Sequence, residues 1–154
     1  MVNSLVDPNR YTFSSLMSLL IQNEGKLKEL YEKTSKEVSG EKLKAFLTQS
    51  SENSSKRINL MQRARVERVV EMTLEPITDL NLTDLIVTIN RILQHGNINN
   101  LEKTIRLEKA VSELYARASP RIMQTSSDTG QLLLELSRES IERYQELEQY
   151  AHSV

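Results

Sequence analysis

One internal repeat constrains this chain more than any other feature of its sequence. Segment 21–38, IQNEGKLKELYEKTSKEV, returns later in the chain as segment 105–122, IRLEKAVSELYARASPRI. The positions that are identical in the two copies are Ile21/Ile105, Glu24/Glu108, Glu29/Glu113, Leu30/Leu114, Tyr31/Tyr115 and Ser35/Ser119. Self-similarity of this kind indicates related structural units. The sequence therefore predicts two related halves, each with a Glu in the middle of an apolar stripe.

The spacing of apolar residues predicts that both halves are helical. Apolar side chains recur in steps of three and four, which is typical of one buried helix face. Only four Gly and three Pro interrupt the chain, and such sparse punctuation favours long helices. We predict an all-α fold in a single domain, 1–154. Two helical hairpins, at about 13–73 and 99–150, flank a crossover at 74–98 that contains a short helix.

The second helix of each hairpin also repeats, which extends the self-similarity to most of the chain. Aligned with a shift of 87, the matched pairs are Phe46/Leu133, Leu47/Leu134, Ser50/Ser137, Glu52/Glu139, Leu60/Leu147 and Gln62/Gln149. Two hairpins joined by one long crossover form the connectivity of ferritin-like four-helix bundles. The chain resembles the ferritin-like superfamily, with rubrerythrin-type domains as the nearest match. The features that carry the resemblance are Glu24…Tyr31, Glu108…Tyr115, FLTQSSENSSKR, LLELSRESIER and VVEMTLEPITDL.

The resemblance implies a site for two iron or manganese ions in the core. In this family two helices each supply one Glu, and the other two each supply Glu-x-x-His. The first pair would be Glu24 and Glu108, and the Glu of the motifs would be Glu52 and Glu139. Both motif histidines are absent, because Ser55 and Glu142 stand in their places. The metal ligands that the resemblance implies are thus all carboxylates: Glu24, Glu52, Glu108, Glu139 and Glu142.

The missing histidines leave two functions open. The first is a reduced di-iron or di-manganese site with metal or oxidative-stress chemistry. The second is a non-catalytic scaffold or assembly protein, without a cofactor, whose site has become a buried polar network. Uncompensated carboxylates are costly in a core, and the cations that could neutralise them are Lys26, Lys56, Lys109 and Arg143. We expect Tyr31 and Tyr115 to bond a Glu of the neighbouring helix, and His95 and His152 to lie at the surface.

Composition removes several other classes of function. The chain has no Cys, which rules out disulfides, thiolate catalysis and iron–sulfur clusters. The net charge of -1 and the scattered basic residues predict no nucleic-acid or membrane partner. The first residues lack the pattern of a signal peptide, so we expect a cytoplasmic protein. The resemblance further implies a homo-oligomer, a dimer or larger.

Overall fold

The computed structural model describes residues 10–72 and 76–152, and this part of the chain folds into helices without a strand. The helices are α1 (Phe13–Glu37), α2 (Glu41–Met72), α3 (Thr83–Gln94), α4 (Asn100–Met123) and α5 (Ser127–His152). The predicted all-α class is confirmed. None of these helices is both long enough and apolar enough to cross a membrane.

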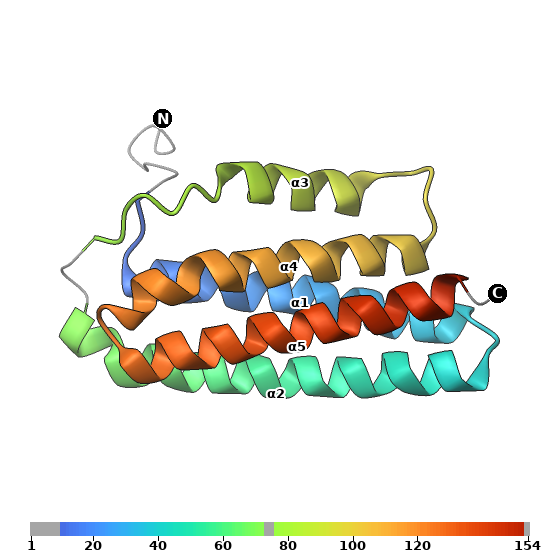
Figure 1. Ribbon diagram of the computed structural model, residues 1–154, viewed down its shortest axis with the longest axis horizontal. Helices are drawn as coiled ribbons and strands as arrows, with labels where there is room; N and C mark the ends of the chain where they lie inside the picture. The colour runs from blue at the N-terminus through green and yellow to red at the C-terminus, as the bar shows by residue number, and fades with distance from the viewer. Residues whose placement is uncertain (1–9, 73–75, 153–154) are drawn as a thin grey trace.

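The four long helices lie side by side in two antiparallel hairpins (Figure 1). Helix α1 packs along α2, α4 packs along α5, and the two hairpins meet mainly through α1 and α4. Helices α2 and α5 contact each other far less. The shorter α3 lies along α4, and its buried side chains are Leu85, Ile89 and Ile92. The two hairpins therefore share a core that contains many buried side chains of α1 and α4.

Capping side chains mark the start of α1 and of α4. Thr12 caps α1 by accepting a hydrogen bond from the Ser15 amide, and Asn99 caps α4 in the same way. Such side chains satisfy amide groups that the first turn leaves without a partner. At the start of α3, Leu82 holds the N-cap position without a side-chain bond.

The turn between α4 and α5 begins after Met123, although a proline stands earlier in α4. Pro120 lies in the last turns of this helix. A proline removes one backbone hydrogen bond, and near a helix end this loss affects few following residues. Gly130 then allows the close return of α5, since a Cβ there would lie 2.6 Å from the Met123 Cα.

Burial shows that α2 and α5 are related by a shift of 86, one less than the sequence match suggested. At this shift the buried side chains of one helix fall on buried side chains of the other. The pairs are Leu47/Leu133, Ser51/Ser137, Ser54/Ser140, Arg57/Arg143 and Met61/Leu147. The repeated core motif of these two helices is thus Ser-x-x-Arg. The pairing of Glu52 with Glu139 does not describe equivalent positions.

Candidate functional site

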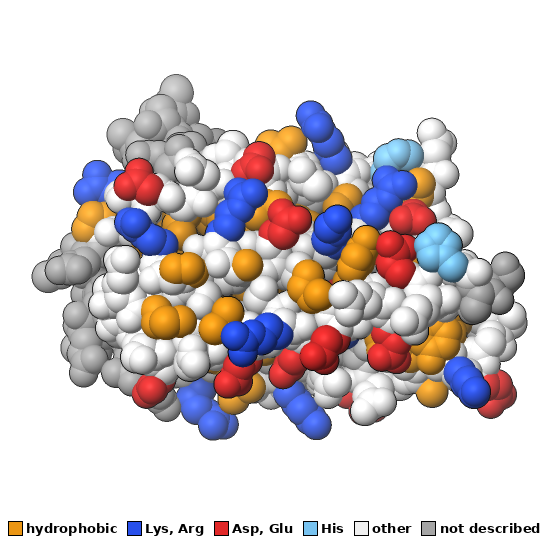
Figure 2. All heavy atoms as spheres, in the orientation of Figure 1, with side chains coloured by type: hydrophobic (Ala, Val, Ile, Leu, Met, Phe, Trp, Pro, Cys, Tyr) orange, Lys and Arg blue, Asp and Glu red, His pale blue; other side chains and the backbone are white. Residues whose placement is uncertain are grey.

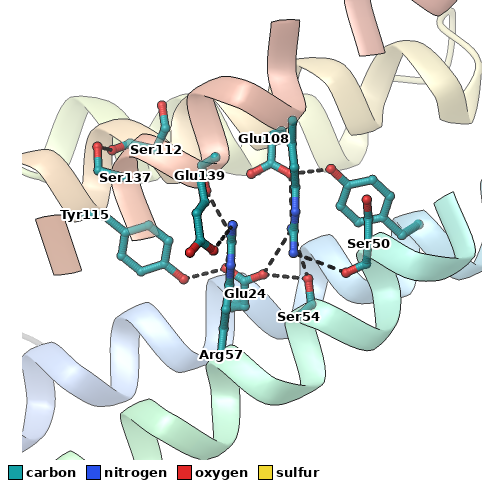
Figure 3. A network of polar contacts seen from close by, with 12 residues as sticks. Glu24, Ser50, Ser54, Arg57, Glu108, Ser112, Tyr115, Ser137 and Glu139 are labelled. Carbon is teal, nitrogen blue, oxygen red and sulfur yellow. Dashed lines mark hydrogen bonds and ion pairs between the residues drawn. The ribbon is translucent and has the colours of Figure 1, made fainter. Parts of the chain in front are cut away.

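Two carboxylates form the centre of the core, one from each half of the chain. Glu24 on α1 and Glu108 on α4 are both fully buried. Each accepts a hydrogen bond from the tyrosine of the other half, so that Tyr31 donates to Glu108 and Tyr115 donates to Glu24 (Figure 3). The predicted Tyr–Glu bonds are confirmed. They tie α1 to α4 twice, in a crossed arrangement that follows from the sequence repeat.

Arg57 of α2 is the first of two buried cations in this cluster. Its Nη1 lies 3.5 Å from Glu24 Oε1 and donates to Ser140 Oγ at 2.9 Å. Its Nη2 donates to Glu139 Oε1 at 3.2 Å. Arg57 thereby connects the first hairpin to the second through both a charge and a hydroxyl.

Arg143 of α5 is the second buried cation, and it reaches both central carboxylates. Its Nη1 lies 3.3 Å from Glu108 Oε1 and 3.6 Å from Glu24 Oε2. The same nitrogen donates to Ser54 Oγ, and Nη2 donates to the Ser50 carbonyl oxygen, each at 3.2 Å. Since Arg143 comes from the second hairpin and Ser50 and Ser54 from the first, these bonds join α5 to α2 across the core.

Two carboxylates and two guanidinium groups make the centre of this network electrically neutral. Ser54 completes it by donating to Glu24 Oε2 at 2.6 Å. We call Glu24, Tyr31, Ser54, Arg57, Glu108, Tyr115, Ser140 and Arg143 the core charge network. Buried charges are tolerated when they are paired and hydrogen-bonded. Two polar atoms of the network stay without a partner in the described part of the chain, Arg57 Nε and Glu108 Oε2.

The burial of these groups shifts their protonation. Burial raises the pKa of Tyr31 and of Tyr115 well above the ordinary value, and the neighbouring carboxylates raise it further, so both hydroxyls stay protonated donors. Burial also raises the pKa of Glu108, while Arg143 opposes that rise. For Arg143, burial alone would lower the pKa, but Glu108 and the other nearby acidic groups more than compensate and raise it.

The five predicted metal ligands do not gather around one point. Glu24 and Glu108 are in the core, but Glu52 and Glu142 are exposed, and the Glu139 side chain is 58% exposed while it pairs with Arg57. Among the residues that the structure describes, no three His, Asp or Glu are grouped to hold a metal ion. The donor set does not fit two metal ions, because Arg57 and Arg143 already place two buried positive charges against Glu24 and Glu108. Metal binding itself stays a prediction.

Sequence reasoning missed Arg57, one of the two buried cations of the network. With the shift of 87, Arg143 was matched to Lys56, and Lys56 is exposed. Lys26 and Lys109 also make no contact with the central carboxylates in the described part of the chain. The signal for Arg57 was present as a repeat of Ser-x-x-Arg at 54–57 and 140–143. The identical pairs of the other alignment favoured a shift of 87, and two of them, Glu52/Glu139 and Gln62/Gln149, lie on exposed faces. His95 and His152 are exposed, as predicted.

The raised pKa of Glu108 gives a pH dependence that can be measured. A carboxyl group whose pKa is higher in the folded state than in the unfolded state stabilises the fold at low pH. Its full contribution to the free energy of unfolding is present below the unfolded pKa of about 4.3, and it is lost as the pH rises through the pKa of the folded state. Glu108→Gln mimics the protonated form and removes this titration. We expect the free energy of unfolding of the wild type minus that of Glu108→Gln to be larger at low pH than at neutral pH. Urea unfolding at several pH values checks this, and a difference that grows with pH would contradict it.

No family model, curated protein or solved structure matches this chain.

Proposed function

We propose that this chain is a ferritin-like four-helix bundle in which two arginines have replaced the metal ions, and that it acts as a non-catalytic binding or scaffold protein. The observation that carries the proposal is the neutral pairing of Glu24 and Glu108 with Arg57 and Arg143. A divalent ion bridging the two carboxylates would repel the two guanidinium groups, which are buried against the same carboxylates.

The helix order supports the ferritin-like part of the proposal. Hairpin, crossover and hairpin is the connectivity of that superfamily, and α3 lies within the crossover. The single Glu of the family's pattern corresponds to Glu24 and Glu108. The Glu-x-x-His of the pattern corresponds to Ser54-x-x-Arg57 and Ser140-x-x-Arg143, so that both metal-binding residues of each motif are changed. Self-association and the absence of nucleic-acid and membrane partners stay predictions.

Metal analysis of the purified wild type tests the proposal. The protein is unfolded, refolded in the presence of Fe(II) or Mn(II), passed over a desalting column and measured by inductively coupled plasma mass spectrometry. Refolding with metal present gives the ion access before the arginines close the site. We expect metal near zero per chain, because the carboxylates pair with Arg57 and Arg143. About two ions per chain, the number that the family's site holds, would overturn the proposal and favour the metal-binding alternative.

A further inference from the structure

The weak contact between α2 and α5 leaves a groove along one side of the molecule. The groove has a volume of about 430 Å³ and runs between these two helices. Arg57 and Arg143 of the core charge network are among the residues that line it. Every other pair of neighbouring long helices in the described bundle packs more closely, so the seam between α2 and α5 is the most open of these contacts.

Apolar side chains line the groove and one of them is well exposed. These side chains are Phe46, Leu60, Leu132 and Leu136. Leu60 is 43% exposed although it lies between core positions of α2. Exposure of single apolar residues is ordinary, but here the exposed leucine is part of a concave surface with three further apolar side chains. Such a surface can bury the apolar anchors of an additional helix.

Four glutamates form a ridge along the α5 side of the groove. They are Glu135, Glu139, Glu142 and Glu146, which follow one another at helical steps of four, three and four. All four are exposed, and acidic side chains gather over α5 in Figure 2. Only Glu139 forms an ion pair within the described residues. Like charges at these steps destabilise a helix by about 0.2–0.5 kcal/mol per pair, so folding of α5 does not explain the ridge.

The groove offers little positive charge to balance this ridge. Lys56 is the one exposed cation among the residues that line it. Arg57 and Arg143 also line it, but they are buried and engaged by Glu24 and Glu108. The accessible part of the groove therefore combines an apolar floor with an excess of negative charge.

We propose that this groove is the docking site for a basic amphipathic helix of a partner protein. An amphipathic helix binds such a groove with apolar residues at i, i+3, i+4 and i+7. Lys or Arg on its flank would face Glu135, Glu142 and Glu146, and complementary charge would orient the helix and speed its association. A second copy of this chain is a poorer occupant, because a two-fold interface places the same patch on both sides. The glutamates of one copy would then face and repel the glutamates of the other.

The inference deepens the proposed binding role and rests on it, but its test is independent of metal content. The probe is a fluorescein-labelled synthetic helix of Leu and Lys with apolar positions at i, i+3, i+4 and i+7. A peptide with Glu in place of every Lys is the charge control. Fluorescence anisotropy with the full chain should give binding of the Leu/Lys peptide that is at least ~100-fold tighter than that of the Leu/Glu peptide and that weakens with added salt. Equal binding of the two peptides would overturn the proposal.

Substitutions then locate the binding surface. The triple variant Glu135→Gln/Glu142→Gln/Glu146→Gln leaves the core charge network intact. It should weaken the binding of the Leu/Lys peptide at least ~10-fold. Leu60→Lys, which places a cation at the apolar floor, should weaken it by a similar factor. The matched control removes the same charge elsewhere, with Glu29→Gln/Glu32→Gln/Glu113→Gln. If the control weakens binding as much as the groove variant, the peptide responds to net charge alone and the docking site is refuted. Circular dichroism checks that each variant is folded.

Discussion

Replacing Arg143 with methionine is expected to lower the free energy of unfolding by about 3–5 kcal/mol, the usual cost of leaving a buried charge without its partner. The Arg143 side chain is 8% exposed and lies against Glu108 and Glu24, both fully buried. Methionine keeps much of the volume and removes the charge and the bond to the Ser50 carbonyl oxygen. Urea unfolding followed by circular dichroism at 222 nm measures the change.

Two further variants separate the loss of a charge partner from the loss of packing. Lys56→Met removes the same charge from an exposed position of α2 and should change stability by no more than about 0.5 kcal/mol. Combining Arg143→Met with Glu108→Gln should recover part of the loss, since the uncompensated carboxylate is then gone. If Arg143→Met costs no more than Lys56→Met, the two central carboxylates do not need Arg143 and the proposed neutral network is wrong.

The crossed Tyr–Glu pairs could be predicted because both partners are in the more strongly repeated helices. Glu24 and Tyr31 lie two turns apart on one face of α1, and Glu108 and Tyr115 do so on α4. Apolar residues surround all four positions, so burial followed from periodicity alone. A buried Tyr needs one partner for its hydroxyl, and the neighbouring Glu was the available acceptor.

The sequence did not determine in the same way that Arg57 and Arg143 are buried in the core. In α2 the polar run Gln49–Ser55 interrupts the apolar stripe, and the remaining apolar residues do not fix which face is buried. Leu60 and Met61 are adjacent, yet Leu60 is exposed and Met61 is fully buried. When the shift used to match α2 to α5 changes from 87 to 86, the equivalent of Arg143 changes from Lys56 to Arg57. Glu139, which the first match predicts in the core, is then assigned to the groove between the helices. Only the packing against α1 and α4 decides between these faces.

The network explains how a core with so many polar groups keeps a single arrangement. Arg57 bonds Ser140, and Arg143 bonds Ser54 and the Ser50 carbonyl oxygen, so each arginine of one hairpin is held by the other hairpin. A one-residue slip between the hairpins would break these bonds and leave buried charges without partners. We infer that the network fixes the alignment of the two hairpins, a role in specificity that buried polar groups serve in some helical proteins.

The proposed ferritin-like relationship predicts that installing two Glu-x-x-His motifs converts the core into a metal site. The variant Ser54→Glu/Arg57→His/Ser140→Glu/Arg143→His supplies Glu-x-x-His on α2 and α5 beside Glu24 and Glu108, which completes the ligand set of a ferritin-like di-metal centre. The geometry favours this design, because Ser54 Oγ already lies 2.6 Å from Glu24 Oε2 and both arginines lie against Glu24. After refolding with Fe(II), Mn(II) or Co(II), we expect about two ions per chain, against near zero for the wild type.

Stability gives a second readout that does not depend on metal retention during purification. Without metal the variant holds four carboxylates and two histidines in its core and no arginine beside them, so it should unfold at lower temperature than the wild type. A divalent ion that binds only the folded state raises stability in proportion to the logarithm of its concentration. The midpoint of thermal unfolding should therefore rise with added Co(II) in this variant and stay constant in the wild type. Adding Glu24→Gln and Glu108→Gln should abolish the rise. A folded variant that binds no metal would show that α1, α2, α4 and α5 do not set these side chains in the ferritin-like arrangement.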